Sequence, residues 1–211
     1  MVEVTGIYKS YRNREILKGA SFTAEPGKCT GIVGVNGCGK TTLLSIVAGA
    51  AKADRGTVRH TEKTAYVPQE NPLMEELSVK DNLILWHRGN KKETEKDLEQ
   101  GPAAMLGLSQ YSRMAAGKLS GGMKKRLSIA CALADQARIL IMDEPGAALD
   151  LVCKQIISDY LKQYMKQGGT VILTSHEIEE LKLCEVIYIM KNGILTPLPC
   201  RFPVEQLVEK L

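Results

Sequence analysis

Apolar and polar residues alternate near the start of the chain, and helical and apolar patterns follow. Residues 2–8 and 21–24 alternate as in strands with one buried face, and Glu-Pro-Gly-Lys at 25–28 predicts a turn after them. Residues 29–35 are apolar enough for a buried strand, and a glycine-rich stretch separates them from a helical pattern over 41–50. We therefore predict an antiparallel β edge near the N-terminus, followed by strand, glycine loop and helix.

The middle of the chain has a helical pattern. Residues 57–60 and 64–67 resemble two short strands, and residues 79–133 are then mainly helical and charged. Residues 91–99 carry many charges of both signs, which is typical of a solvated helix face and not of a binding patch. We predict an inserted α-helical subdomain at about residues 72–134.

The last part of the chain alternates strands and helices. Strands are predicted at residues 139–142, 170–174 and 186–190, and helices at about 152–167, shortly before 186, and at 204–211. Such alternation predicts a mostly parallel sheet with helices on its faces, which is an α/β fold. Because no internal repeat is present, we expect residues 1–211 to form a single domain with one copy of this unit.

The composition is that of a soluble globular protein, with 44% hydrophobic and 25% charged residues among 211. These values exclude a disordered, fibrous or low-complexity chain. Basic residues exceed acidic ones by 28 − 24 = 4, which suits an anionic ligand or surface without identifying it. The six cysteines form no CxxC pair and no zinc-binding spacing, so we expect reduced and mostly buried thiols.

The amino-terminal residues 1–5 include an acidic residue and no long apolar run, unlike a signal or transit peptide. The longest apolar runs, such as residues 186–190, are far shorter than the ~20 residues that span a bilayer. We therefore expect a cytoplasmic chain that does not cross a membrane by itself.

The strongest motif is the sequence Gly-Val-Asn-Gly-Cys-Gly-Lys-Thr at 34–41, which matches the phosphate-binding pattern G-x-x-x-x-G-K-[ST]. Glycines let successive N–H groups point at phosphate oxygens, and the following helix presents its positive end to the same anion. Lys40 would neutralise the terminal phosphates, and the Thr41 hydroxyl is suited to Mg²⁺. The residues predicted to bind the nucleotide here are Asn36, Gly37, Cys38, Gly39, Lys40, Thr41 and Thr42.

A second motif, at residues 139–145, is an apolar strand that ends in two acidic residues. This order places Asp143 and Glu144 at the carboxyl edge of a parallel sheet, where such sheets bind ligands. We predict that Asp143 holds Mg²⁺ through water, and that Glu144 is the general base for an attacking water molecule.

The sequence Leu-Ser-Gly-Gly-Met at 119–123 resembles the LSGGQ signature of the ATP-binding cassette (ABC) family. With the two motifs above, the resemblance extends over nearly the whole chain and implies a P-loop NTPase core. It also implies that Ser120, Gly121 and Gly122 contact the nucleotide that is bound to a partner subunit. A helix predicted directly after these residues would face that phosphate with its positive end.

Three further positions match the family pattern. Gln69, in Tyr-Val-Pro-Gln, resembles the glutamine that contacts Mg²⁺ and couples to the transport partner. His176, at a predicted strand end, resembles the histidine that contacts the γ-phosphate. Tyr11 matches the aromatic residue that stacks on adenine, with Tyr8 as the alternative.

Two positions depart from the family pattern. Met123 replaces the usual glutamine of the signature, and Ala147 stands where serine is common. Neither position supplies a metal ligand or a nucleophile, so we expect ATP binding to be unaffected. The missing serine hydroxyl is expected to weaken the contact between the two sites of a dimer.

The resemblance implies an ATP-hydrolysing subunit of a membrane transporter. Two such chains, as a homodimer or a heterodimer with a related subunit, would close head to tail on two ATP·Mg²⁺. A separate membrane permease would bind the pair on the cytoplasmic face of the membrane, so the chain would be peripheral. The short chain after His176 favours an exporter-type subunit.

Two alternatives belong to other functional classes. The same cassette powers ATPases that act on DNA or ribosomes, and the charge of +4 suits nucleic acid. The long coiled coil or tandem cassette expected there is absent from the sequence, so nucleic acid is not the partner we expect. A small-molecule kinase would leave residues 119–123 unexplained.

Overall fold

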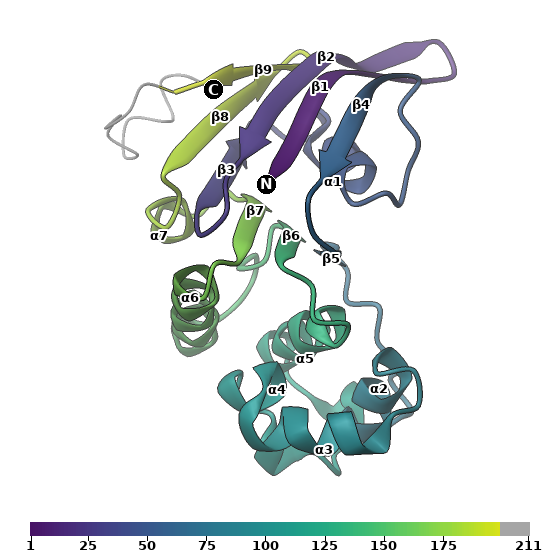
Figure 1. Ribbon diagram of the computed structural model, residues 1–211, viewed down its shortest axis with the longest axis vertical. Coiled ribbons are helices and arrows are strands. Elements are labelled where there is room, and N and C mark those ends of the chain that lie inside the picture. Colours follow the sequence, from purple (N-terminus) through teal and green to yellow (C-terminus); the bar gives the residue numbers. More distant parts are fainter. Residues whose placement is uncertain (199–211) are drawn as a thin grey trace.

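The computed structural model describes residues 1–198, which form two sheets with helices packed around them. Figure 1 shows the strands in the upper part of the molecule and helices α2 to α5 together in the lower part. The predicted helix at 204–211 lies outside the described residues.

The first sheet is antiparallel. Within residues 1–198 it contains β1 (Val2–Tyr11), β2 (Arg14–Ala24) and β4 (Arg55–His60), in the order β2-β1-β4. Arg12 adopts a φ of 54° in the turn between β1 and β2. The two strands are longer than predicted, and they form a sheet of their own beside the main one.

The second sheet is mostly parallel and runs through the centre of the fold. Its strands within residues 1–198 are β3 (Cys29–Val33), β5 (Thr64–Val67), β6 (Ile139–Asp143), β7 (Thr170–Thr174), β8 (Val186–Lys191) and β9 (Ile194–Pro197). They lie in the order β5-β6-β7-β3-β8-β9, and the β8–β9 pair is antiparallel. The predicted α/β fold with a mostly parallel sheet and antiparallel strands near the N-terminus is confirmed.

Strand β9 was not predicted, although the sequence carries a hairpin signal before it. Asn192 and Gly193 adopt φ values of 52° and 79°, and an Asn-Gly pair with two positive φ angles is a favoured two-residue hairpin turn. The strand itself is short and mostly exposed, so its hydrophobic pattern is weak.

The helices described are α1 (Lys40–Val47), α2 (Val79–Trp86), α3 (Lys91–Gln100), α4 (Pro102–Met105), α5 (Gly121–Leu133), α6 (Leu151–Lys166) and α7 (Ile178–Leu181). Several begin at a residue whose side chain accepts a hydrogen bond from the first turn: Ser78 for α2, Asn90 for α3, Ser120 for α5 and Asp150 for α6. Helices α2 to α5 fall within the range predicted for the inserted subdomain.

The parallel sheet separates two cores. Strands β3, β6 and β7 are buried along their whole length, as expected for a parallel sheet covered on both faces. Along β6, Ile139 and Ile141 pack in the core that contains α1 and the antiparallel sheet. Leu140 and Met142 point the other way, into the core that contains α5 and α6. This alternation fixes which face of β6 meets which layer.

We expect Leu140→Ala to lower the free energy of unfolding by about 2–5 kcal/mol, because the Leu140 side chain is fully buried and its removal leaves a cavity. Leu151→Ala is the matched control, since Leu151 is 82% exposed, and its effect should stay within about 0.5 kcal/mol. Urea unfolding followed by circular dichroism measures both. Equal effects of the two variants would contradict this account of the core.

Candidate active site

The site lies at the edge of the parallel sheet where strands β5, β6, β7 and β3 end. Because neighbouring parallel strands end at the same edge, the loops that follow them meet there. Gln69 follows β5, Asp143 ends β6 with Glu144 next, and His176 follows β7. The glycine loop follows β3 and leads into α1.

The glycine loop needs glycine at two positions for different reasons. Gly39 directly precedes α1 with a φ of 112°, which favours glycine because other residues are strained there. At Gly34, a Cβ atom would collide with the carbonyl oxygen of Met190. Within the described residues no side chain caps α1, so the free N–H groups of its first turn are available to an anion.

The loop forms one wall of a cavity of about 380 Å³. The cavity is lined by Tyr11, Ile16, Asn36, Gly37, Gly39, Lys40, Thr41, Thr42, Gln69 and Glu144. All of these except Ile16 were predicted from the sequence as site residues. Tyr11 is 51% exposed, so a face of its ring is accessible to a planar group.

Lys40 is the central cation of this cavity. Its side chain is only 5% exposed, and its Nζ donates to the carbonyl oxygen of Gly34 at 2.7 Å. The same Nζ lies 3.2 Å from His176 Nε2 and 3.9 Å from Glu144 Oε1. A buried ammonium with one carboxylate near it leaves positive charge available, which favours the binding of an anion.

Glu144 occupies a strained position beside Lys40. Its φ is 47°, a left-handed value that costs a residue other than glycine about 1–3 kcal/mol and often marks a functional site. Its N–H donates to Thr174 Oγ1 at 3.0 Å. Its two carboxylate oxygens lie 3.4 Å from His176 Nε2 and 3.5 Å from Gln69 Nε2. The backbone thus aims the carboxylate between the histidine and the glutamine.

Asp143 offers an oxygen atom to a cation. Thr174 Oγ1 donates to Asp143 Oδ1 at 2.5 Å, whereas Oδ2 is buried and has no hydrogen-bond partner among the described residues. Mg²⁺ prefers oxygen ligands and is usually held by one or two carboxylates together with substrate phosphates. Asp143, with the Thr41 and Gln69 side chains that line the cavity, therefore suits this ion.

The signature residues Ser120, Gly121 and Gly122 do not line the cavity. Ser120 Oγ accepts a hydrogen bond from the Met123 N–H at 3.3 Å and so begins α5. Ser120 and Gly121 are exposed, whereas Gly122 is packed so closely on Cys153 that a side chain would collide with its sulfur. Ser120 and Gly121 therefore lie on the surface of the chain outside the cavity, whereas Gly122 is buried.

Cys38 lines a neighbouring hollow with Lys191, and not the cavity itself. The five cysteines within residues 1–198 are free, and three of them are buried. The sulfurs of Cys29 and Cys184 lie 3.1 Å apart. Cys200 lies outside the described residues.

Several polar residues of the site were missed from the sequence. Thr174 holds both Asp143 and the backbone of Glu144, and the hydroxyl of Ser175 donates to Glu180 Oε2 at 2.5 Å. Burial raises the pKa of Glu180. The signal that was available is the pair Thr174-Ser175, because both polar residues end an otherwise apolar strand at the ligand-binding edge.

These features define a class of protein. A glycine loop before a helix, a buried lysine, an aspartate with a free oxygen and a glutamate beside a histidine are the parts of a P-loop nucleotide triphosphatase. Together with the separate Ser-Gly-Gly helix start, they are the parts of an ATP-binding cassette.

Comparison with known proteins agrees with this class. The family model described as ABC transporter matches residues 17–147. Nod factor export ATP-binding protein I of Sinorhizobium fredii is 32% identical over 208 residues, which cover 91% of this chain and 60% of that protein. Linearmycin resistance ATP-binding protein LnrL of Bacillus subtilis is 34% identical over 213 residues, covering 92% of this chain and 67% of that protein. The chain belongs to the ABC transporter family.

Solved structures share the fold. An ATP-binding subunit of an ABC transporter has a TM-score of 0.88 at 21% identity, with 100% of this chain and 98% of that chain covered. A dimeric ATP-binding cassette bound to ADP and Pi has a TM-score of 0.84 at 24% identity, with 96% and 100% covered. Among residues 1–198, none of the helices has the length and apolar character needed to cross a membrane.

We expect Glu180→Gln to change how stability depends on pH. Because burial raises the pKa of Glu180, the folded wild-type chain holds this proton more tightly than the unfolded chain. Its free energy of unfolding should therefore fall as the pH rises from the ordinary glutamate value of 4.5 toward the raised one. The amide keeps an acceptor for Ser175 and does not titrate, so the variant should lack this decline.

Urea unfolding of both proteins at a series of pH values from 4 to 7.5 measures this difference. Glu179→Gln is the control, because the Glu179 side chain is 82% exposed. Parallel pH profiles for wild type and Glu180→Gln would contradict the prediction.

Proposed function

We propose that this chain is the ATP-hydrolysing subunit of a membrane exporter. The observation that carries the proposal is the meeting of Lys40, Glu144 and His176, whose polar atoms lie 3.2–3.9 Å apart. Lys40 and Glu144 line the cavity, and His176 contacts both of them from outside the lining. A cation, a carboxylate base and a histidine at the end of a phosphate-binding loop are the groups that phosphoryl transfer to water requires.

ATP would bind with its adenine on Tyr11 and its phosphates on the N–H groups of residues 36–42. Lys40 would neutralise the terminal phosphates, and Thr41, Gln69 and Asp143 would hold Mg²⁺ directly or through water. When bound, Mg²⁺ neutralises charge on the phosphate oxygens and so assists the transfer.

Hydrolysis would begin when Glu144 accepts a proton from a water molecule. The water oxygen attacks the γ-phosphorus, and the bond from that phosphorus to the bridging oxygen breaks, so that ADP and phosphate are the products. His176 contacts the γ-phosphate and helps to place it. Lys40 stabilises the charge that develops on the phosphate oxygens.

The site of one chain would be completed by a second cassette. Ser120, Gly121 and Gly122 do not line the cavity of their own chain, which supports a head-to-tail dimer in which they contact the partner's nucleotide. The positive end of α5 would then face phosphate. A homodimer suffices for this chemistry, and a heterodimer with a related subunit supplies the same groups.

The export function is proposed from the relatives, whose names refer to Nod factor export and linearmycin resistance. In this proposal the membrane permease is a separate chain, and the present chain binds it on the cytoplasmic face of the membrane. Helices α2 to α5 would act as the signature subdomain of residues 72–134.

An apolar groove next to Gln69 is the surface that we propose for the membrane partner. It has a volume of about 790 Å³, and Pro68, Met74, Leu85 and Trp86 are among its lining residues. Met74 and Leu85 are each more than half exposed, which is unusual for large apolar side chains that lie together. An apolar cytoplasmic segment of a permease would cover them.

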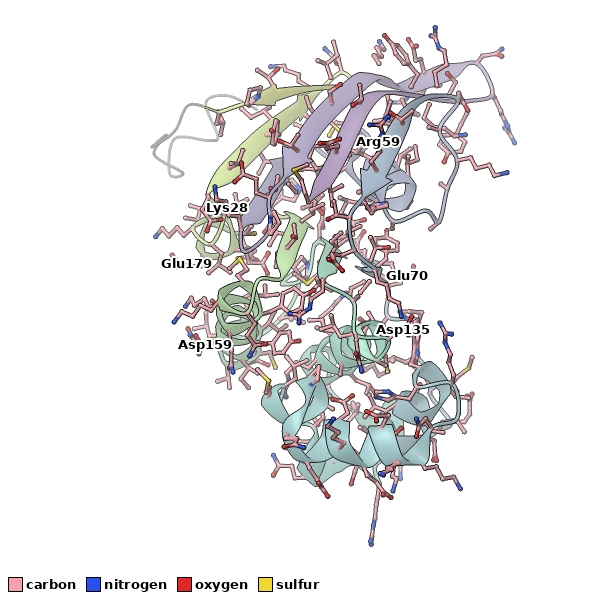
Figure 2. All side chains as sticks on the ribbon, in the orientation of Figure 1. Lys28, Arg59, Glu70, Asp135, Asp159 and Glu179 are labelled. Atoms are coloured by element: carbon pink, nitrogen blue, oxygen red, sulfur yellow. The ribbon has the colours of Figure 1, made fainter. Side chains whose placement is uncertain are left out.

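The groove lies between strand β5 with the loop that follows it and helices α2 and α5. Figure 2 shows Glu70 and Asp135 at the junction of the strands with the helical part, and Asp135 is one of the residues that line the groove. Since Pro68 lines the groove and Gln69 lines the cavity, a partner bound here would adjoin the nucleotide site.

The test of hydrolysis and dimerisation is light scattering of Glu144→Gln with and without ATP and Mg²⁺. Removal of the base should trap the closed dimer, so the mass should double from the 23.1 kDa of one chain only when ATP is present. Adding Ser120→Arg to this variant should prevent doubling without preventing ATP binding. If Glu144→Gln binds ATP and stays at the mass of one chain, the homodimer is wrong and a heterodimer is required.

Co-purification tests the groove. We expect Leu85→Asp to lose the membrane subunit in a pull-down from solubilised membranes of the source cell, because a carboxylate is costly in an apolar contact. Met114→Asp is the matched control, since Met114 is 38% exposed and does not line the groove. A permease retained by Leu85→Asp would contradict the docking surface. Nucleic acid or ribosomal proteins in the wild-type pull-down would favour the alternative function.

A further inference from the structure

A buried lysine in α5 has no assigned role in nucleotide chemistry. Lys125 is 4% exposed, and its Nζ donates to the carbonyl oxygens of Pro68 at 3.0 Å and of Gln69 at 2.9 Å. Burial lowers the pKa of Lys125, and this effect is opposed by the negative charges of Asp143 and Glu180. Its side chain thus joins the signature helix to the loop that carries Gln69.

Burial of the Lys125 ammonium group is costly. Both of its hydrogen-bond acceptors are neutral carbonyl groups, and the negative charges of Asp143 and Glu180 offset the cost of burial only in part. An apolar side chain of similar length would avoid this cost, but it would leave the two carbonyl oxygens without these hydrogen bonds. The two hydrogen bonds do, however, fix the backbone of Pro68 and Gln69 relative to α5.

The loop from Pro68 to Ser78 is attached to the helical half at two further points. Asn82 of α2 is 1% exposed, accepts from the N–H of Met74 at 2.9 Å and donates to its carbonyl oxygen at 3.0 Å. Lys124 Nζ lies 2.6 Å from Glu75 Oε1. Because the loop is bonded to α2 and α5 along its length, a displacement of Gln69 would carry these helices with it.

The two residues that Lys125 holds face two different places. Gln69 lines the nucleotide cavity, where its Nε2 lies 3.5 Å from Glu144 Oε2. Pro68 lines the apolar groove together with Trp86. Pro68 and Gln69 are consecutive residues, so a single peptide unit joins the groove to the nucleotide cavity. The ammonium group of Lys125 donates to the carbonyl oxygens of both residues.

We propose that Lys125 is a positioning residue that makes Gln69, the start of α5 and the groove move as one unit when nucleotide binds. This inference rests on the proposed function, because it requires ATP in the cavity. It assigns a link between the cavity and the groove to one side chain that lines neither of them. Loss of the Lys125 ammonium group should leave ATP binding intact, but the groove should then no longer change when ATP binds in the cavity.

Trp86 provides the readout. It is the single tryptophan among the 211 residues, it is 41% exposed, and it lines the groove. Its fluorescence therefore reports on the groove and on the adjoining hollow that Trp86 also lines. In the wild-type chain, addition of ATP and Mg²⁺ should shift its emission with the same midpoint as ATP binding measured by calorimetry.

Lys125→Met removes the hydrogen bonds and keeps a buried side chain of similar length. We expect ATP to bind with a dissociation constant within about twofold of wild type, the Trp86 shift to be lost, and kcat to fall roughly threefold to thirtyfold with KM unchanged. Lys125→Arg should restore the shift and much of kcat, since the guanidinium group also donates to two carbonyls. Lys162→Met, at an exposed ion pair with Asp159 on α6, is the matched control.

Each result separates the inference from the proposed function. If the wild-type chain does not bind ATP, the proposed function fails and the inference with it. If ATP binds and is hydrolysed but Trp86 does not respond, or Lys125→Met keeps the full response and kcat, only the inference is overturned. Loss of ATP binding in Lys125→Met without rescue by Lys125→Arg would also overturn it, because the residue would then be merely structural.

Discussion

The parallel register between β6 and β7 determines how the site is assembled. Asp143 lies opposite Thr174 in this pair, and the hydroxyl of Thr174 donates to the Asp143 carboxylate at 2.5 Å. A shift of one residue would turn every side chain of β6 to the other face of the sheet. Asp143 and Glu144 would then lose their places relative to the glycine loop. A buried polar pair thus fixes the position of the Asp143 carboxylate and of Glu144 next to it.

The charges around the cavity are balanced only in part, which explains how a strained segment is retained there. Lys40 is almost fully buried, and the nearest carboxylate oxygen, of Glu144, is 3.9 Å away, which is a long distance for an ion pair. The glutamate therefore neutralises the lysine only weakly. A bound polyphosphate would supply the missing negative charge. The favourable free energy of its binding would then offset the conformational strain of the positive φ at Glu144.

The parts of the site that the sequence predicted are those encoded by neighbouring residues. The glycine loop, Lys40 and the acidic pair at 143–144 are local patterns, and their meeting follows from the common direction of parallel strands. The contacts of Lys125 with Pro68 and Gln69 join residues 56 and 57 positions apart. Such pairings depend on how α5 packs against the loop after β5, and periodicity carries no information about that packing.

The same distinction applies to the fold. Strand β7 was predicted at its observed bounds, and β6 and β3 were predicted to within one and two residues at their ends, because short apolar runs mark buried strands of a parallel sheet. The lengths of β1 and β2 were underestimated. These strands carry polar residues on one face, and their pairing is irregular, with register shifts between Val4 and Tyr8 that interrupt the alternation of apolar and polar residues. Sheet order and the division of antiparallel strands into a separate sheet depend on tertiary packing, which the pattern of single strands does not record.

The start of α5 is a second part of the chain where the positive end of a helix lies near solvent. In α5, which the structure describes throughout, the first turn contains no acidic residue, so the positive end of this helix is not neutralised by its own side chains. Ser120 and Gly121 expose that end to solvent. The cavity around Lys40 is a second region that attracts anions, and it lies elsewhere on the chain. In one chain the two regions do not line the same cavity. The head-to-tail arrangement proposed above would bring the start of α5 of one chain to the polyphosphate bound by the other, and loss of the γ-phosphate would weaken that contact.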